Sequence, residues 1–150
     1  MQLAEVFKEN LIFLDFEAEN KELAIDKMVS AVGATGGIED APGLKAALID
    51  REKLGTTGVG EGIAIPHARC SAVKELMAVF FRSPAGVGFD AIDSKPVNLI
   101  FLLLAPVSSG GPYLKLLAKI SRMLRSNEFR GALLEAKAPR DVMEIIQEND

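Results

Sequence analysis

The sequence holds one histidine, His67, and this residue is the first candidate for chemistry. Imidazole has an ordinary pKa near neutrality, so it can serve as a nucleophile or as a base. By the two-residue period of a strand, Ile63, Ile65 and His67 would share one face, where the imidazole could simply complete a buried surface. Pro66 removes a backbone donor and fits a strand that ends here, which would place the histidine at the rim of a sheet. Both interpretations stay open on these residues alone.

Arg51 is the second candidate, because it continues the helical spacing of the apolar residues Leu44 and Leu48. A guanidinium directed toward the interior requires an anion, and its planar fork can bind two phosphate oxygens at once. Alternatively, Arg51 ends its helix, complements the helix dipole and reaches solvent, where it could pair with Asp50 or Glu52. The spacing does not decide between these two roles.

A glycine-rich segment, 55–62, separates the two candidates in the sequence. Thr56 and Thr57 could donate hydroxyls to an oxyanion, and backbone N–H groups at Gly58 and Gly60 could do the same. Turn formation would explain these residues equally well. The segment lacks the Gly-Lys-Ser/Thr ending of a Walker loop, and a strand follows it where a dinucleotide fingerprint requires a helix. We therefore exclude nucleotide binding by either route.

Other catalytic centres fit the sequence poorly. There is no Gly-x-Ser-x-Gly elbow, so a small hydrolase with His67 as its base is only a third interpretation. A metal centre needs several imidazoles or a cluster of acids, and the single cysteine, Cys70, can form neither an internal disulfide nor a thiolate cluster. We expect no metal and no cofactor.

The elements that must position these residues follow from apolar periodicity and from helix caps. The stripe Ile25, Met28, Val29 and Val32 predicts a helix capped by Asn20, with Gly33 as its left-handed C-terminal residue. The run 97–105 is apolar at both alternating positions, as is typical of a central strand covered on both faces. We expect further strands over 11–16, 63–67 and 76–81, and further helices that begin at Asp40, after Pro112, at Glu128 and at Pro139.

This alternation predicts an α/β or α+β sandwich, in which one domain over residues 1–150 has a mixed β-sheet with helices on both faces. The 17 basic and 21 acidic residues give a formal net charge of −4, which argues against nucleic acid as a partner. The beginning of the chain resembles no secretory signal, and the longest apolar stretch, 99–106, is too short to cross a membrane. We expect a cytoplasmic protein without membrane insertion.

The segment 52–68 reads EKLGTTGVGEGIAIPHA. It closely resembles the active-site signature of the fructose/mannitol/nitrogen-type (type 2) enzyme IIA domains of the bacterial phosphoenolpyruvate-dependent sugar phosphotransferase system. The match comprises an acidic residue, a spacer, Val59-Gly60 and the run from Ile63 to Ala68. A looser likeness covers the rest of the chain, including the position of Arg51 and the run 103–118.

The resemblance implies a role for both candidate residues. His67 would accept a phosphoryl group from the histidine-containing phosphocarrier protein and pass it to an enzyme IIB partner, which makes the chain a phosphotransferase-type carrier with a phosphohistidine intermediate. Arg51 would be the arginine of the phosphate site. The physical chemistry agrees, because neutral imidazole is a good nucleophile at phosphorus, and the transferred dianion needs fixed donors and a nearby cation. Arg51 and the glycine amides would supply them.

Tyr113 stands where many members of that family have a second histidine facing the first. Its hydroxyl could bind a phosphoryl oxygen, or Tyr113 could simply head the apolar stripe of its helix. Four basic residues follow on another side of that helix, and we assign them, if anything, to docking a partner: Lys115, Lys119, Arg122 and Arg125.

A second function from another class stays open. The chain could be a nitrogen-type regulatory protein that acts through phosphorylation-dependent binding of a target protein, without a sugar substrate. The residues do not say which sugar, if any, stands at the end of a phosphoryl relay, nor which ring nitrogen would be phosphorylated.

Overall fold

The apolar run Val97–Ala105 forms β6, the central strand of the sheet, as its pattern predicts. Antiparallel β5 (Met77–Val87) pairs with one edge of β6. Two short parallel strands, β3 (Ile63–Ala64) and β4 (His67–Arg69), follow one another along the other edge. Every residue of β6 except Asn98 is buried, which is the expected result for a strand with neighbours on both sides and helices on both faces.

Two further strands complete the sheet. The computed structural model describes residues 2–150, and over these residues the strand order is β1-β5-β6-β3-β2, with β4 paired to β6. β1 (Ile12–Phe13) is parallel to β5, and β2 (Gly58–Gly60) is antiparallel to β3. The sheet therefore mixes parallel and antiparallel pairs, as predicted.

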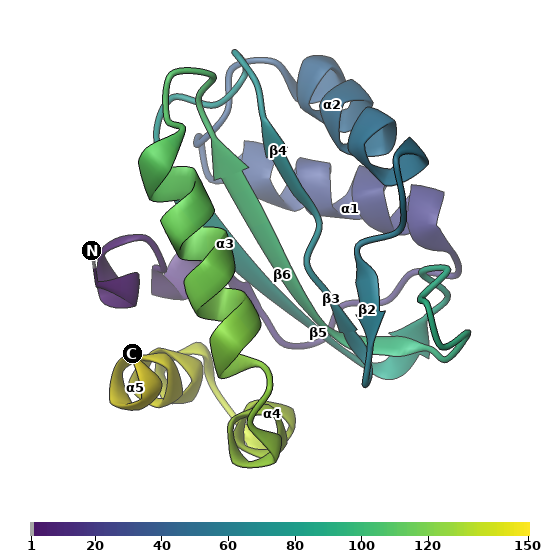
Figure 1. Ribbon diagram of the computed structural model, residues 1–150, viewed down its shortest axis with the longest axis vertical. Coiled ribbons are helices and arrows are strands. Elements are labelled where there is room, and N and C mark those ends of the chain that lie inside the picture. The colour runs from purple at the N-terminus through teal and green to yellow at the C-terminus, as the bar shows by residue number, and fades with distance from the viewer. Residues whose placement is uncertain (1) are drawn as a thin grey trace.

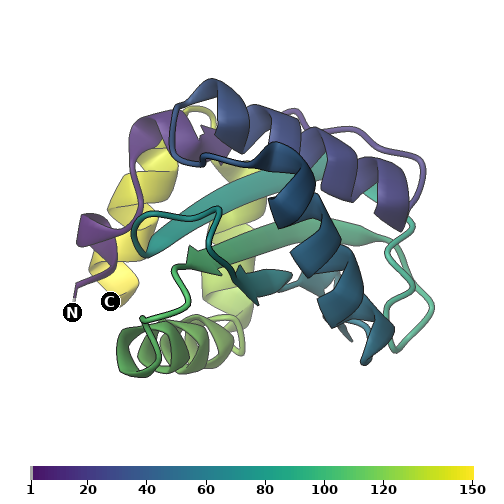
Figure 2. The same cartoon turned by 90° about the horizontal axis from the view of Figure 1, so that it is seen from above.

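Helices cover both faces of the sheet (Figure 1; Figure 2). α1 (Lys21–Ala34) and α2 (Ala41–Lys53) pack on one face. α3 (Gly111–Met123), α4 (Asn127–Glu135) and α5 (Pro139–Asn149) pack on the other, together with the short 3-10 helices η1 (Leu3–Glu5) and η2 (Glu9–Leu11) near the N-terminus. The α+β architecture predicted from the sequence is confirmed. In the described part of the chain, no helix is both long and apolar enough to span a membrane.

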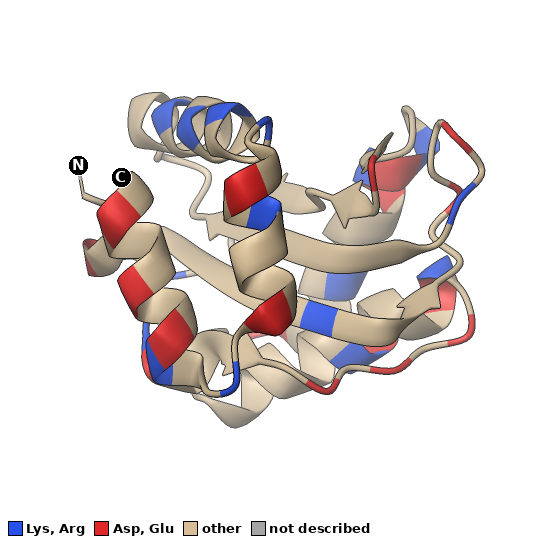
Figure 3. Cartoon of the chain, turned by 90° about the horizontal axis from the view of Figure 1, so that it is seen from below, with Lys and Arg blue, Asp and Glu red and all other residues tan. Residues whose placement is uncertain are grey.

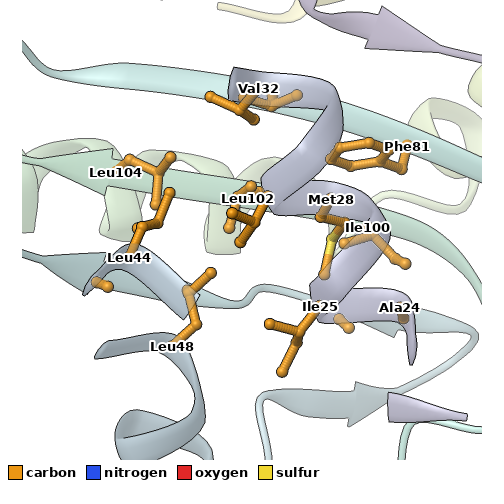
Figure 4. Close-up of a cluster of buried hydrophobic side chains, with 14 of the residues drawn as sticks. Ala24, Ile25, Met28, Val32, Leu44, Leu48, Phe81, Ile100, Leu102 and Leu104 are labelled. Atoms are coloured by element: carbon orange, nitrogen blue, oxygen red, sulfur yellow. The ribbon is translucent and has the colours of Figure 1, made fainter. Parts of the chain in front are cut away.

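The stripe predicted on α1 is core. Ile25, Met28 and Val32 are at most 1% exposed and face β6 together with Leu44 and Leu48 of α2 (Figure 4). Truncating one such side chain to alanine costs about 2–5 kcal/mol of stability, because a cavity remains. This packing fixes α2 over the sheet, and so fixes the position of its last turn.

The helix starts are predicted to within two residues, since α3 begins at Gly111 and α4 at Asn127, but one helix end is not predicted correctly. The Asn20 carboxamide oxygen accepts a hydrogen bond from the backbone N–H of Leu23 at 3.0 Å and so caps α1. The Asp40 carboxylate accepts a hydrogen bond from the backbone N–H of Gly43 and so caps α2. Gly33, expected as the left-handed residue after α1, lies inside the helix instead. The left-handed residue is Gly36, with φ +80°, because α1 continues through Ala34.

The strand predicted over 63–67 is interrupted. β3 ends at Ala64 and β4 begins at His67, with Pro66 between them. Pro66 has no N–H to donate, but its carbonyl accepts a hydrogen bond from Leu103 of β6 at 3.0 Å, so the chain stays on the same sheet edge. The strand predicted over 11–16 is also shorter, since only Ile12–Phe13 pairs with β5.

Candidate functional site

His67 is the first residue of β4, at the edge of the sheet. It pairs with Leu103 of β6, and its side chain is half-buried. The next residue, Ala68, packs into the core between the sheet and α1 and α2. The alternation of the strand therefore turns His67 and Arg69 to the same side, away from Ala68. Pro66 ends the preceding segment, so the imidazole stands at the rim of the sheet, and the fully buried alternative is wrong.

Two hydrogen bonds determine the protonation of the His67 ring. Its Nδ1 lies 2.7 Å from the carbonyl oxygen of Ile65, and its Nε2 lies 3.2 Å from Nε of Arg51. A carbonyl oxygen can only accept, so Nδ1 carries the proton and donates it. A guanidinium can only donate, so Nε2 presents its lone pair. The imidazole is thus neutral, and its free nucleophilic nitrogen is Nε2.

Burial lowers the pKa of His67 below its ordinary value of 6.5, and the positive charge of Arg51 lowers it further. The hydrogen bond to Ile65 and the negative charge of Glu52 act in the opposite direction. The net lowering of this pKa keeps the ring neutral at physiological pH, which is the protonation state that a nitrogen nucleophile needs.

Arg51 reaches His67 from the last turn of α2, which packs against β4. Its Nη1 donates to the carbonyl oxygen of Gly55 at 3.1 Å, while its Nε donates to His67. The guanidinium therefore bridges the start of the glycine-rich segment and the imidazole. The alternative expectation, in which Arg51 pairs with Asp50 or Glu52, is not what the structure shows, since Asp50 pairs with Lys53 and Glu52 with Lys21.

Glu52 holds the glycine-rich segment in place. Its Oε1 accepts a hydrogen bond from the backbone N–H of Thr57 at 3.0 Å, and its Oε2 accepts one from the Thr57 hydroxyl at 2.5 Å. Lys21 of α1 donates to the same carboxylate at 2.8 Å and to the Thr56 hydroxyl oxygen at 3.1 Å. The side chain of Glu52 is only 6% exposed. One buried carboxylate thus joins α1, α2 and the segment that leads to His67.

The four residues of this segment predicted to bind phosphate have internal partners here. Thr57 donates to Glu52, while Thr56 donates to the carbonyl of Phe89 and accepts from the N–H of Gly58. A Cβ at Gly58 would lie 2.8 Å from the Cα of Ala91, so close packing explains this glycine. Gly60 has φ +96°, a left-handed conformation that favours glycine. These residues shape the segment, and their contact with phosphate stays a prediction.

Tyr113 faces His67, as the resemblance implied for its position. The two ring centroids are 6.0 Å apart, although the residues come from the first turn of α3 and the start of β4. Tyr113 is buried, and burial raises the pKa of its phenol, so this group stays a neutral donor. The Cζ of Arg69 lies 5.6 Å from the centroid of the same ring. Tyr113 therefore belongs to the surroundings of the imidazole while it also heads the apolar stripe of α3.

Residues 5–149 match the family described as Phosphoenolpyruvate-dependent sugar phosphotransferase system, EIIA 2. The chain belongs to this family. The resemblance of the segment 52–68 is confirmed, and it extends over nearly the whole chain.

Curated EIIA 2 relatives carry two kinds of name. The fructose-specific EIIA component of Haloferax volcanii is 38% identical over 92% of this chain and 90% of its own length. The fructose-specific EIIABC component of Bacillus subtilis is 35% identical over the whole chain, which spans only 24% of that longer protein. A nitrogen regulatory protein of Bradyrhizobium diazoefficiens is 35% identical over 97% of this chain and 92% of its own length.

Solved structures similar to this chain also include both nitrogen regulatory proteins and sugar-specific IIA domains. The nitrogen regulatory protein IIA-Ntr from Neisseria meningitidis superposes with a TM-score of 0.88 at 34% identity, and the match covers 95% of this chain and 97% of that one. Enzyme IIA mannitol of Escherichia coli, in its complex with phosphorylated enzyme IIB mannitol, has a TM-score of 0.79 at 25% identity, with 95% and 97% covered. The fold predicted from the sequence is therefore that of solved IIA domains.

Sequence reasoning did not single out Arg69 or Lys21 near the EIIA site, and it named Glu52 only as a possible partner of Arg51 and as the acidic residue of the motif. Arg69 is two residues after His67, so the two-residue period of a strand could have found it. Lys21 and Glu52 are 31 positions apart and meet only because α1 and α2 pack together, and no local pattern reveals such a pair.

Three members of the predicted basic strip lie on α3, where Figure 3 shows Lys and Arg without Asp or Glu, and the fourth, Arg125, follows the end of that helix. Lys115, Arg122 and Arg125 are exposed. Lys119 forms an ion pair with Asp150 at the end of the chain, so that member of the strip serves the packing of the fold. A docking role for the others stays a prediction.

Proposed function

We propose that the chain is a phosphocarrier of the phosphoenolpyruvate-dependent sugar phosphotransferase system and that residues 1–150 act as one EIIA domain in the cytoplasm. His67 accepts a phosphoryl group from the histidine-containing phosphocarrier protein and passes it to an enzyme IIB partner. The observation that carries the proposal is the neutral imidazole of His67, with Nδ1–H held by Ile65 and the lone pair of Nε2 directed at Arg51. No metal or cofactor takes part.

The transfer is an in-line exchange between two histidines. The lone pair of Nε2 attacks phosphorus while the P–N bond of the donor phosphohistidine breaks, and that electron pair returns to the donor ring. The donor ring carries a proton on its other nitrogen and leaves as neutral imidazole. His67 keeps its Nδ1 proton and becomes a phosphorylated imidazolium, whose positive charge is stabilised by the carbonyl of Ile65. When the group passes to enzyme IIB, a nucleophile of that partner attacks phosphorus, the P–Nε2 bond breaks, and its electron pair returns to Nε2, so that His67 is again a neutral imidazole.

Arg51 has a different contact in each state. In the resting site its Nε donates to Nε2, so the guanidinium must move off the lone pair before phosphorus arrives. Its donors then turn to the phosphoryl oxygens, where charge-assisted hydrogen bonds are strongest. The contact of Nη1 with Gly55 keeps the guanidinium beside the imidazole during this change.

The surroundings of the site support a protein partner. Large apolar side chains are exposed on residues next to the site in the sequence: Leu54 at 84%, Val59 at 48% and Leu114 at 62%. A transient partner buries apolar surface at the centre of its contact, so these residues are suited to docking. The mannitol relative has been solved in complex with phosphorylated enzyme IIB, which supports the same class of partner for this chain.

The test is phosphorylation with purified components. The chain is incubated with phosphoenolpyruvate and the two general phosphotransferase proteins, and its intact mass is measured before and after mild acid. We expect one acid-labile phosphoryl group, none on His67→Ala, and its loss when an enzyme IIB of the fructose or mannitol type is added. Absence of labelling with donor proteins that label a known IIA domain would refute the proposal.

A regulatory role is the second candidate, favoured by the nitrogen regulatory relative and by the match to IIA-Ntr at a TM-score of 0.88. In that case the phosphorylation state of His67 controls binding to a target protein, and no sugar is transported. The phosphorylated chain and the His67→Ala variant are then used as baits for partner capture. A partner retained by only one of them supports regulation, whereas equal capture by both would remove phosphorylation from the mechanism.

A further inference from the structure

We infer that Arg69 and Tyr113 form a second side of the phosphoryl site, in which Arg69 supplies a second cation to the phosphoryl group on His67 and Tyr113 positions it. The inference rests on the proposed function, because it concerns the same phosphoryl group. It assigns the site two positive charges from different elements: Arg51 from α2 and Arg69 from β4.

Arg69 is placed on the side of the strand that carries His67. Both residues belong to β4 and flank the buried Ala68, so their side chains leave the strand in the same direction. Arg69 is exposed, and within residues 2–150 no carboxylate forms an ion pair with it. Its contact is instead with the face of Tyr113, at 5.6 Å from Cζ to the ring centroid. A cation held on an aromatic face keeps its N–H donors free at its edge.

Tyr113 links Arg69 to the imidazole. Its ring contacts both residues, since the centroid lies 6.0 Å from that of His67 and 5.6 Å from Cζ of Arg69. The residue is only 7% exposed, and in the described part of the chain its hydroxyl forms no hydrogen bond, although the oxygen atom itself reaches solvent and is therefore accessible to a ligand. Arg69 lies over this ring, and the charges of Arg51 and Arg69 both lower the pKa of the phenol against the effect of burial, so both guanidinium groups are near it. An acceptor between them, such as a phosphoryl oxygen, would satisfy it.

The charges around Arg69 also favour an anion at this place. A Cβ built at Gly110 would lie 3.6 Å from Nη1 of Arg69, so this guanidinium stands beside the N-cap residue of α3. Helix N-termini carry partial positive charge, and the first turn of α3 has no acidic residue to offset it. Arg69 is thus held at an electropositive end by its aromatic contact alone. A phosphoryl dianion on His67 would offset the repulsion between the Arg69 guanidinium and the N-terminus of α3. Arg69 would therefore gain an anionic partner only when His67 is phosphorylated.

The position of β4 explains why residues from both helical layers lie near the imidazole of His67. β4 lies between α2 and α3 at the sheet edge (Figure 1), and these helices cover opposite faces. Arg51 approaches the imidazole from the α2 side, and Tyr113 with Arg69 approaches from the α3 side. A phosphoryl group on Nε2 would therefore meet donors from both faces of the sheet.

The experiment compares Arg69→Gln with Arg140→Gln, which removes an exposed arginine on α5. We measure the rate of phosphoryl uptake and, by ³¹P NMR, the pKa of the phosphoryl group on His67. Arg69→Gln should slow uptake about tenfold, as loss of one charged donor to an oxyanion implies, and should raise that pKa. Arg69→Lys should restore most of the pKa shift, because it keeps the charge. Tyr113→Phe should slow uptake about threefold, because it keeps the ring and loses the donor.

The outcomes separate this inference from the proposed function. Thermal unfolding of each variant shows that it is folded before it is compared. If Arg69→Gln matches Arg140→Gln in both uptake rate and phosphoryl pKa, the second cation is refuted while the carrier function stands. If the wild-type chain itself takes up no phosphoryl group, the carrier function fails, and this inference fails with it.

Discussion

Nε of Arg51 lies 3.2 Å from Nε2 of His67, a contact that joins the end of α2 to the edge of the sheet. The arginine occupies the lone pair that must attack phosphorus, so it protects the nucleophile from protonation and stands where the product anion will form. A single residue thus serves the empty and the loaded state. Its removal should affect both.

Replacing Arg51 by glutamine should slow phosphoryl uptake by about two orders of magnitude, as loss of one donor to a developing oxyanion does. The pKa of His67 should also rise, because one of the two causes of its lowering is the charge of Arg51. Rapid-quench kinetics measure the first effect and an NMR titration of the imidazole the second. Lys53→Gln, an exposed neighbour in α2, is the control, and equal rates for the two variants would contradict the role of Arg51.

Acid should destabilise the fold through His67. The pKa of this residue is lowered in the folded chain, so between that value and 6.5 the unfolded chain binds more protons. The stability that the neutral His67 ring contributes is therefore fully present above about pH 6.5. It falls as the pH drops toward the lowered pKa of the folded chain, and it changes no further below that pKa. Urea unfolding over this range should show a shallower pH dependence for His67→Gln. An unchanged slope would argue against a half-buried ring that is neutral in the folded chain.

The Lys21–Glu52 contact should contribute more stability than an exposed pair does. Glu52 is 6% and Lys21 16% exposed, and both also bind the threonines of the glycine-rich segment. Glu52→Gln should cost about 1–3 kcal/mol, since Lys21 is left without its carboxylate. A double-mutant cycle with Lys21→Met should show coupling above about 1 kcal/mol. Asp50→Asn is the control, because the pair of Asp50 with Lys53 is largely exposed and should contribute little.

Gly58 and Gly131 form a matched pair for the packing of the glycine-rich segment. A Cβ at Gly58 would lie 2.8 Å from the Cα of Ala91, a backbone atom that cannot rotate away, so Gly58→Ala should cost about 1–3 kcal/mol. A Cβ at Gly131, inside α4, meets nothing within 4 Å. Gly131→Ala should therefore stabilise the fold by about 0.5–1 kcal/mol. Opposite signs in urea unfolding confirm the argument, and equal effects would refute it.

Buried elements are the part of this fold that the sequence reveals. The helical stripe of Ile25, Met28 and Val32 and the apolar run of β6 are visible because burial leaves no polar residue at those positions. Strand ends are less visible, since the break between β3 and β4 depends on Pro66 and on the pairing with β6. The end of α1 also escaped prediction, because two glycines, Gly33 and Gly36, could each have supplied the left-handed residue.

In the candidate site, too, some features can be predicted from the sequence and others depend on tertiary contacts. His67 and Arg51 can be identified from residue type and spacing, and the motif around His67 leads to the EIIA 2 family. The contacts that orient them cannot be read locally, since Arg51 meets His67 across 16 positions and Lys21 meets Glu52 across 31. Such contacts arise only when α1 and α2 pack on the sheet.

The hydrogen bond that fixes the tautomer of His67 comes from the main chain of Ile65, only two positions away. A carbonyl group is present whatever residue occupies position 65, so point mutation cannot abolish this restraint as it could a carboxylate partner. The orientation of the His67 ring therefore depends on the path of the backbone and not on a neighbouring side chain. Side chains such as Arg69 and Tyr113 can therefore be replaced without losing the hydrogen bond that orients the ring.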